Sequence, residues 1–333
     1  MSQRNCFNSV PKGLYFPTER RKFVHRIFGP VPSRRLGRSL GIDVIPHKTC
    51  SFDCVYCECG ATTNKTCKRE EFYPLEELLE ELDERLSSME VRPDYLTLSG
   101  AGEPTLYSRM GELIRRAKEM TGLPVAVITN SSLLHMEDVR RELMEADVVL
   151  PSLDAARAES FIKINRPHRR CDLAEIMQGL KTFLSGYKGK VLFEVLLIDG
   201  YNTEPEDLEA LKEFLDSVRV DRIQLNTVVR PGTIRELKAL GSERLEEIRE
   251  FFGPKCEIVA SGYTSAKGKE TDTEIEEILS LLKRRPCTLE DIHNSTGIPI
   301  PGLIKTLDEL IEKDEITTNV FNGKTYYTTE AKD

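Results

Sequence analysis

Two kinds of apolar pattern alternate along residues 39–261 and predict alternating strands and helices. Short, nearly continuous apolar runs are typical of strands whose two faces are both covered. These runs lie at 39–46, 95–100, 125–130, 147–154, 190–199, 222–229 and 256–261. Between them, apolar residues recur at roughly every third or fourth position, which indicates amphipathic helices. These helical segments lie at 74–89, 108–120, 136–146, 172–184, 204–218 and 242–252.

The order of these elements predicts an α/β fold with a mostly parallel sheet, because helical crossovers bring successive strands back in the same direction. About six strand–helix units are present, fewer than a full barrel of this type contains. A partial, open (β/α)6 barrel fits this count, and a flat, doubly wound sheet remains the alternative. Residues 28–41 are rich in Arg, Pro and Gly and predict an ordered loop that leads into the first strand.

The character of the sequence changes near residue 265, where a polar segment at 265–272 indicates a linker. Helical patterns follow at 273–285, 288–297 and 299–316. Extended residues then flank Asn322-Gly323, a dipeptide typical of hairpin turns. Three helices followed by a hairpin are the pattern of a winged-helix domain. We therefore predict a barrel domain with an N-terminal extension at 1–265 and a winged helix at 266–333.

The second domain has enough apolar positions for a small core of its own. The residues expected there are Ile275, Ile278, Leu281, Leu289, Ile292, Leu303, Leu307, Leu310 and Ile316.

Composition and charge narrow the class of protein. Of the 333 residues, 39% are hydrophobic and 31% are charged, which is the balance of a globular chain. A net charge of −8 gives no global attraction for nucleic acid or for an anionic membrane. The first residues lack the apolar stretch of a signal peptide, and the apolar run at 191–198 is too short to span a bilayer. We expect a cytoplasmic protein with no membrane partner.

Four of the nine cysteines lie within ten residues, at Cys50, Cys54, Cys57 and Cys59. Cytoplasmic thiols stay reduced, so this cluster predicts metal ligation rather than disulfides. The spacing C-x3-C-x2-C lets one loop hold three corners of an iron–sulfur cube and leaves one iron free. Zinc held by four thiolates, with Cys59 as the fourth, is the alternative. The other cysteines, Cys6, Cys67, Cys171, Cys256 and Cys287, are expected to be small buried or neutral thiols.

The second predicted strand ends in Gly100, Ala101, Gly102 and Glu103. The two glycines allow the backbone to approach a ligand closely, and the carboxylate can pair with an ammonium group. Ligand sites of parallel sheets lie at this carboxyl edge of the strands. A turn with a helix-capping glutamate is the structural alternative.

Polar residues also end the later strands. Asn130 ends one strand, Ser152 and Asp154 end the next, and Asn226 and Arg230 follow the sixth. These side chains are candidates to contact ribose hydroxyls or a carboxylate of a cofactor. Ordinary turn residues would have the same types, and this alternative stays open.

The motifs "FGPVPSRRLGRSLGIDVIPHKTCSFDCVYCECGATT", "LTLSGAGEPTL" and "IQLNTVVRPG" resemble the radical S-adenosylmethionine (SAM) superfamily. Within it they are similar to the subgroup related to 4-demethylwyosine synthase, an enzyme of tRNA wyosine formation. The resemblance covers about residues 25–262. It implies a partial barrel with a [4Fe–4S] cluster on Cys50, Cys54 and Cys57, shielded from water by Tyr56.

The same resemblance implies a chemistry. The free iron binds the amino and carboxylate groups of SAM, and a flavodoxin or ferredoxin supplies one electron. Cleavage then gives methionine and a 5′-deoxyadenosyl radical, which abstracts a hydrogen from a substrate. The segment Ala101–Glu103 occupies the place of the GGE motif that holds the methionine amino group, with Ala101 in place of the first glycine.

Three functions remain open from the sequence: modification of a tRNA, modification of a protein docked by the winged helix, and a non-enzymatic metal-binding regulator. From residue 266 onward there are nine Lys or Arg and fourteen Asp or Glu. A nucleic-acid reader is expected to be basic on its recognition face, which favours a protein partner for this domain. Basic residues at Arg34, Arg35 and Arg38, and at 166–170 around His168, leave RNA binding by the barrel open.

Overall fold

The computed structural model describes residues 26–33, 35–89, 91–259, 273–298 and 300–329. In these residues one sheet has eight strands in the order β1-β2-β5-β6-β7-β8-β9-β10. Their bounds are β1 (Ile27–Ser33), β2 (Gly37–Ile42), β5 (Tyr95–Leu98), β6 (Val125–Thr129), β7 (Val148–Pro151), β8 (Lys190–Leu197), β9 (Arg222–Thr227) and β10 (Cys256–Ile258). Every pair from β2 to β10 is parallel, and β1 runs antiparallel to β2. This arrangement confirms the predicted α/β fold with a mostly parallel sheet and fits an open, partial barrel.

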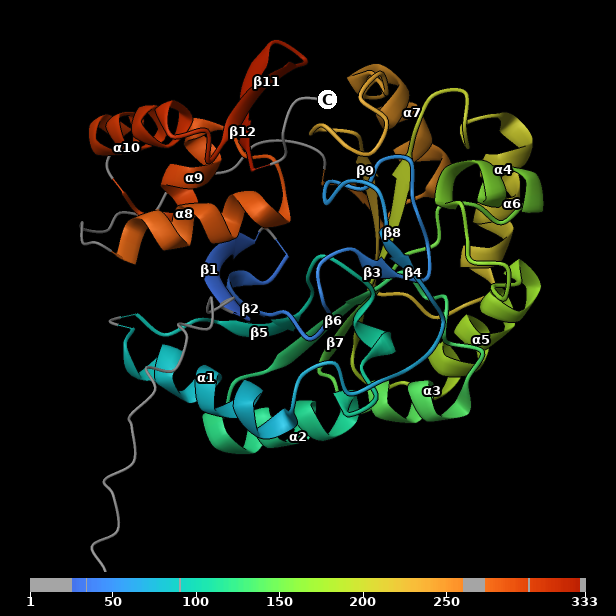
Figure 1. Ribbon diagram of the computed structural model, residues 1–333. Coiled ribbons are helices and arrows are strands. Elements are labelled where there is room, and N and C mark those ends of the chain that lie inside the picture. Colours follow the sequence, from blue (N-terminus) through green and yellow to red (C-terminus); the bar gives the residue numbers. More distant parts are fainter. Residues whose placement is uncertain (1–25, 34, 90, 260–272, 299, 330–333) are drawn as a thin grey trace, which may run out of the picture.

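Helices follow the parallel strands and lie around the outer side of the curved sheet (Figure 1). Their bounds are α1 (Leu75–Ser87), α2 (Met110–Thr121), α3 (Glu137–Leu143), α4 (Ala158–Asn165), α5 (Leu173–Gly186), α6 (Pro205–Asp216) and α7 (Ser242–Phe252). All except α4 were expected. Asp172 caps α5, since its side chain accepts a hydrogen bond from Glu175 N.

The two faces of the sheet carry different apolar clusters. Along β7, Val149 belongs to the large cluster between the sheet and the outer helices, whereas Val148 and Leu150 belong to a small cluster on the opposite face. Successive side chains of a strand point to opposite faces, so the continuous apolar run fills both. The inner face therefore carries a small apolar cluster, while the large core lies between the sheet and the outer helices.

Two elements differ from the sequence expectations. Residues 28–33 form most of strand β1, although Pro30 and Pro32 favoured a loop. Proline is tolerated on an edge strand, and β1 is at the edge of this sheet. Helix α4 lies between β7 and α5, where no helix was expected, because its eight residues are too few for a clear periodicity.

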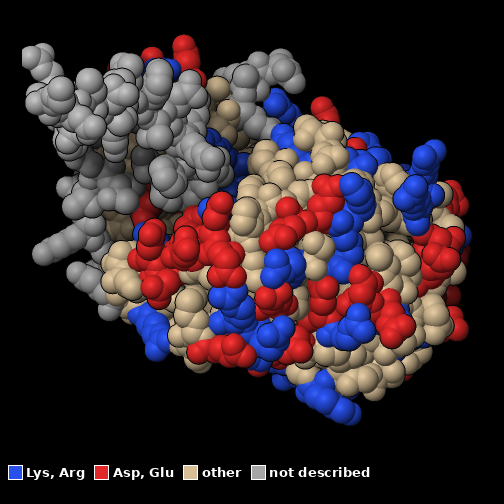
Figure 2. Space-filling model, turned by 60° about the horizontal axis from the view of Figure 1, so that its bottom comes forward, with Lys and Arg blue, Asp and Glu red and all other residues tan. Residues whose placement is uncertain are grey.

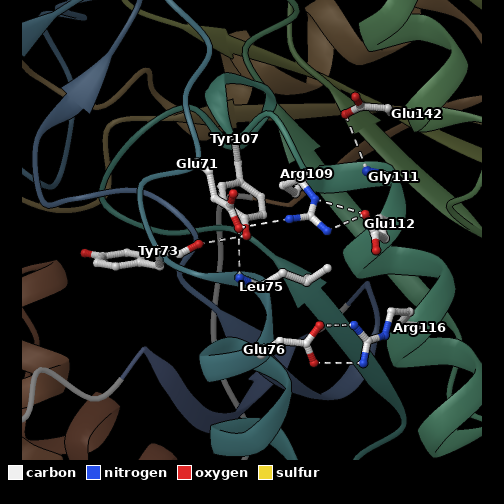
Figure 3. A network of polar contacts seen from close by, with 10 residues as sticks. All are labelled: Glu71, Tyr73, Leu75, Glu76, Tyr107, Arg109, Gly111, Glu112, Arg116 and Glu142. Carbon is white, nitrogen blue, oxygen red and sulfur yellow. Dashed lines mark hydrogen bonds and ion pairs between the residues drawn. The ribbon is translucent and has the colours of Figure 1, made fainter.

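The polypeptide that returns from the cysteine loop is fixed to the outer helices by a polar network (Figure 3). Arg109 pairs with Glu112 of α2 at 2.7 Å and with Glu71 at 3.1 Å. Glu71 also accepts a hydrogen bond from Leu75 N, at the start of α1. The loop is thus held at its far end before α1 begins.

The C-terminal part consists of α8 (Thr273–Arg284), α9 (Leu289–Thr296), α10 (Ile300–Glu312) and a hairpin of β11 (Thr317–Phe321) and β12 (Lys324–Thr328). Asn322 and Gly323 have φ of 48° and 73° and form the predicted turn. Most expected core residues are buried together, but Leu289 is only partly buried and Ile275 is 37% exposed, so the prediction for Ile275 is wrong. This C-terminal module lies against β1 (Figure 1).

Some expectations fall on residues outside the described part of the chain. These are the boundary at 265/266, the linker at 265–272, Cys6 and Arg34. In the part of the chain that the structure describes, no helix combines the length and the apolar character needed to cross a membrane. The cytoplasmic location stays a prediction.

Candidate active site

The cysteine loop follows β2 and folds over the carboxyl edge of the sheet. It contains a short parallel pair, β3 (Thr49–Cys50) with β4 (Asn64–Lys65), and Thr66 N donates to the carbonyl oxygen of Cys50 at 2.9 Å. Thr49 also bridges to Gly102 beyond the end of β5. The loop is therefore an ordered part of the sheet edge, which gives its cysteines fixed positions.

Amide groups of neighbouring segments point at two of the three expected ligand sulfurs. Cys50 Sγ accepts hydrogen bonds at 3.4 Å from Phe52 N and from Asn130 Nδ2. Cys54 Sγ accepts one at 3.4 Å from Asn165 Nδ2, in the last residue of α4. Donors aimed at a sulfur stabilise the thiolate, which is the form that binds a metal.

Burial has the opposite effect on the same thiols. It raises the pKa of Cys50 to about 12 and also raises the pKa of Cys54, while a hydrogen bond with Cys59 lowers the pKa of Cys57. Buried thiolates need a nearby cation, and a metal cluster supplies one.

The donor set therefore fits a cluster held by three cysteines. Among the described residues, however, no three His, Cys, Asp or Glu side chains already surround a common point. The three thiols would have to turn toward a shared centre to hold a cluster. The sulfur of Cys59 also donates to the carbonyl oxygen of Arg284, in the C-terminal part, at 3.0 Å.

The Gly-Ala-Gly-Glu turn after β5 is clamped to the cysteine loop. Lys48 N donates to Ala101 O at 2.7 Å, and Glu103 N donates to Thr49 O at 3.2 Å. A Cβ on Gly102 would lie 2.1 Å from Thr49 O, so only glycine permits this approach. The turn and the cysteines are thus neighbours, as the sequence predicted for a shared site.

Glu103 is 2% exposed and its carboxylate is surrounded by donors of the chain itself. One oxygen accepts from Thr105 N (3.1 Å), Thr105 Oγ1 (2.6 Å) and Thr129 Oγ1 (2.6 Å). The other accepts from Asn130 N at 2.7 Å. Burial raises the pKa of Glu103, and these donors act against that rise. In this structure the carboxylate joins the ends of β5 and β6, and its contact with a ligand stays a prediction.

Asp154 occupies a similar position under the cysteine loop. Its Oδ2 accepts hydrogen bonds from Tyr56 OH at 2.5 Å and from Asn165 Nδ2 at 2.7 Å, and its Oδ1 accepts from Leu196 N at 3.0 Å. Burial raises the pKa of Asp154. The predicted residue Ser152 is half-buried, and its carbonyl oxygen accepts from Ser131 Oγ at 2.9 Å. Asp154 therefore orients Tyr56 beside the cysteines.

A cavity of about 650 Å³ lies between the inner face of the sheet, the cysteine loop and the C-terminal module. Of the predicted site residues, Tyr56, Cys57, Gly100, Asn226 and Arg230 line it. Glu103, Asn130 and Asp154 do not line it, although Asp154 accepts a hydrogen bond from Tyr56, which does. The cavity thus joins the expected cluster loop to the expected cofactor turn.

Sequence reasoning missed an ion pair on the cavity wall, between Arg35 and Glu194 of β8. Both side chains are 19% exposed. Glu194 is the one acidic residue in the apolar stretch 191–198. A charge inside such a strand has to be paired. The position of Glu194 was therefore a sequence signal that could have identified an ion pair.

The C-terminal module contributes charged residues to the same cavity. Arg230 connects it to the cysteine loop, because its guanidinium lies 3.3 Å from Glu58 and 3.2 Å from Asp291 in the first turn of α9. Arg284, at the end of α8, lies over the ring of Phe28 at 4.0 Å, and its Nε is 3.8 Å from Asp43. The module therefore forms one wall of the cavity.

Comparisons with known proteins agree with this geometry. The family model of the radical SAM superfamily matches residues 44–220. A UPF0026 protein of Methanocaldococcus jannaschii is 32% identical over 311 residues, covering 90% of this chain and 94% of that protein. A UPF0026 protein of Helicobacter pylori (strain J99) is 33% identical over 304 residues, covering 90% of this chain and 96% of that protein. These relatives do not bear the name of a wyosine synthase.

A longer protein and a solved structure are also similar. A protein of Brachyspira hyodysenteriae named GTPase Obg is 37% identical over 305 residues, which is 91% of this chain but only 45% of that protein. The structure of a radical SAM methyltransferase from Sphaerobacter thermophilus has a TM-score of 0.53 at 18% identity, covering 67% of this chain and 66% of that one. At this identity the likeness concerns the fold alone.

Proposed function

We propose that this chain, which belongs to the radical SAM superfamily and is similar to UPF0026 proteins, uses the cavity beside Cys57 to modify a macromolecule. Members of the superfamily use a [4Fe–4S] cluster and SAM, so the chain is an enzyme and the non-enzymatic regulator is excluded. When bound, these cofactors supply an electron and a 5′-deoxyadenosyl radical that abstracts a hydrogen from the substrate. We propose a flavodoxin or ferredoxin as the source of that electron.

One observation carries this proposal: Cys57, Tyr56 and Gly100 line the same cavity. Under this proposal Cys50, Cys54 and Cys57 would hold the cluster, and the backbone around Gly100 and Gly102 would contact the methionine part of SAM. Asn130 and Asn165 each donate to one of these sulfurs, which stabilises its thiolate form. The apolar inner face and the ring of Tyr56 keep water away from the reaction.

We also propose finer assignments of the fold. The barrel is the partial (β/α)6 barrel of the superfamily, and three helices with a hairpin at 266–333 form a winged helix. The cavity volume of about 650 Å³ has to hold SAM as well as the reacting group. Only a part of a macromolecule, such as one base or one side chain, fits in the remaining space.

A tRNA is the first candidate substrate, because the motifs resemble the wyosine synthase subgroup. On the face drawn in Figure 2, basic and acidic side chains are interspersed, so that face offers no continuous basic surface to phosphates. Arg35, just before β2, lines the cavity, and Arg38 is the second residue of β2. A tRNA is therefore expected to approach the cavity mouth rather than the face drawn in Figure 2.

A protein is the second candidate, and one feature of α10 favours it. Ile300 and Ile304 are 39% and 43% exposed on this helix, where a reader of nucleic acid would carry basic residues. The excess of acidic residues from 266 onward also favours a protein over a nucleic acid as the partner of this module. A polypeptide docked on α10 would then extend toward the cavity.

The test measures release of 5′-deoxyadenosine by the anaerobic holoprotein with SAM and a one-electron reductant. Total tRNA or total protein from one cell extract is added, each with a portion pretreated with ribonuclease or protease. Stimulation that ribonuclease removes supports a tRNA substrate, and stimulation that protease removes supports a protein. Absence of 5′-deoxyadenosine under all conditions contradicts the proposed chemistry.

A further inference from the structure

Three residues that the sequence left separate meet beside the cysteine loop. Cys67 follows β4, and His168 and Cys171 lie between α4 and α5. Cys67 Sγ is 3.3 Å from Cys171 Sγ and 3.4 Å from His168 Nδ1. All three residues are half-buried rather than fully enclosed. This group does not line the reaction cavity.

The pair of thiols is attached to the backbone around the first cluster cysteine. His168 N donates to Ser51 O at 2.8 Å, and Cys171 N donates to His168 O at 2.8 Å. On the other side, Thr66 N, next to Cys67, donates to Cys50 O at 2.9 Å. A change in the distance between the two sulfurs is therefore passed directly to the segment that carries Cys50.

The hydrogen bonds of His168 define the role of its ring. Arg170 N donates to His168 Nδ1 at 3.2 Å, so this nitrogen is an acceptor and carries no proton. The thiol of Cys67, at 3.4 Å from the same nitrogen, is then the donor. Burial and the positive charges of Arg169 and Arg170 lower the pKa of His168, which keeps the ring unprotonated. A thiol that faces such an acceptor nitrogen in positive surroundings is placed to become a thiolate nucleophile.

Charge around the pair favours anionic reagents. Lys65, Arg169 and Arg170 all lie close enough to act on the charge of His168. Lys65 Nζ also donates to the carbonyl oxygen of Arg166. Two acids lie nearby: Asp53, 4.0 Å from the Arg166 guanidinium, and Asp172, the residue after Cys171. The surroundings are thus net positive, which raises the local concentration of anions.

We propose that Cys67 and Cys171 form a redox-active thiol pair that an anionic low-molecular-weight disulfide oxidises. The proton of Cys67 moves to His168 Nδ1, and the thiolate attacks one sulfur of the reagent. The other half of the reagent leaves as a thiolate, takes this proton from His168 and becomes a thiol. Cys171 then attacks Cys67 Sγ, and the second half of the reagent leaves as a thiol with the proton of Cys171. One reagent disulfide is reduced to two thiols, and one protein disulfide is formed.

The geometry needs little adjustment for this step. The two sulfurs must move from 3.3 Å to the disulfide bond length of about 2.05 Å. Burial raises the pKa of Cys171, so this thiol keeps its proton until the mixed disulfide has formed at Cys67. Cys67 is accordingly the attacking residue and Cys171 the resolving one.

The experiment treats anaerobic holoprotein with glutathione disulfide and, separately, with the cationic disulfide cystamine, and follows free thiols by alkylation and mass spectrometry. We expect Cys67 and Cys171 to be lost together as one linked peptide, at least about tenfold faster with glutathione disulfide at low salt. Cys171→Ser should trap glutathione on Cys67, whereas Cys67→Ser should trap none. His168→Asn should slow the reaction at Cys67, and Cys256→Ser, in β10, should behave as the unchanged protein.

Three results would overturn the proposal. Both thiols could stay fully alkylatable while other cysteines react. Cystamine could react as fast as glutathione disulfide, which would contradict the proposed preference for an anionic reagent. A zinc ion could copurify with the protein, protect both thiols and be lost in Cys67→Ser, which would make the group a metal site. None of these results depends on whether the protein cleaves SAM.

Discussion

The ion pair between Arg284 of the C-terminal module and Asp43 of the barrel gives a quantitative test of how the two parts are connected. Its atoms are 3.8 Å apart, and the side chains are only 12% and 14% exposed. At an effective dielectric constant of about 20, two unit charges at this distance attract by about 4 kcal/mol. We therefore expect the substitutions Arg284→Ala and Asp43→Asn to show a coupling energy of about 2–4 kcal/mol in a double-mutant cycle at pH 8.

The same coupling should depend on pH with a defined sign. Burial raises the pKa of Asp43 from its usual 3.8 to about 6, and Arg284 acts against this rise. Because the folded protein binds this proton more readily than the unfolded chain, Asp43 adds stability as the pH falls from about 6 to about 4. At pH 5 the carboxyl group is mostly protonated in the folded state, so the coupling to Arg284 should largely disappear.

The assay is urea unfolding of the apoprotein, the two single variants and the double variant at pH 8 and pH 5. The surface pair Arg116 and Glu76 provides a matched control, since both groups are exposed and should show little coupling at either pH. A coupling energy at pH 8 no larger than that of the control pair would refute the reasoning. Equal coupling at both pH values would show that Asp43 does not titrate in this range.

Two further predictions concern the site itself. Anaerobically purified protein should carry about four irons per chain and absorb near 400 nm. Alanine at any one of the three cluster cysteines should remove both properties, whereas Cys59→Ala should keep them. Zinc in place of iron would contradict this prediction. Glu103→Gln should lower the free energy of unfolding in urea at pH 8 by about 1.5–3 kcal/mol, because an amide nitrogen then faces Asn130 N and one hydrogen bond to a charged acceptor is lost. An unchanged value would mean that Glu103 is already protonated in the folded protein.

Much of the barrel could be predicted from the sequence because its strands are covered on both faces. A continuous apolar strand such as β8 is stable in a globular protein when both of its faces are covered. The C-terminal hairpin was equally clear, since Asn322 and Gly323 adopt the positive φ angles that this turn requires. Strand β1 was not predicted, because its prolines are compatible with a strand only at an edge, and edge position is a property of the sheet.

The site was predicted where its residues are close in sequence. The three cluster cysteines occupy one loop, so their spacing alone indicated a metal. Arg284 and Asp43 come from different parts of the chain, and the local sequence around either residue does not indicate which residue it pairs with. For Glu103 the residue was found but its surroundings were not, since three of its donors come from Thr129, Asn130 and the Thr105 side chain.

Strand β1 ends the sheet on the side where the C-terminal module lies. An exposed edge strand can pair with another chain and start aggregation. Here α8 and α9 lie against β1, and Pro30 and Pro32 lack the N–H groups that a second chain would need. The module therefore protects the barrel from association with its own copies, so its presence affects the colloidal behaviour of the protein as well as its chemistry.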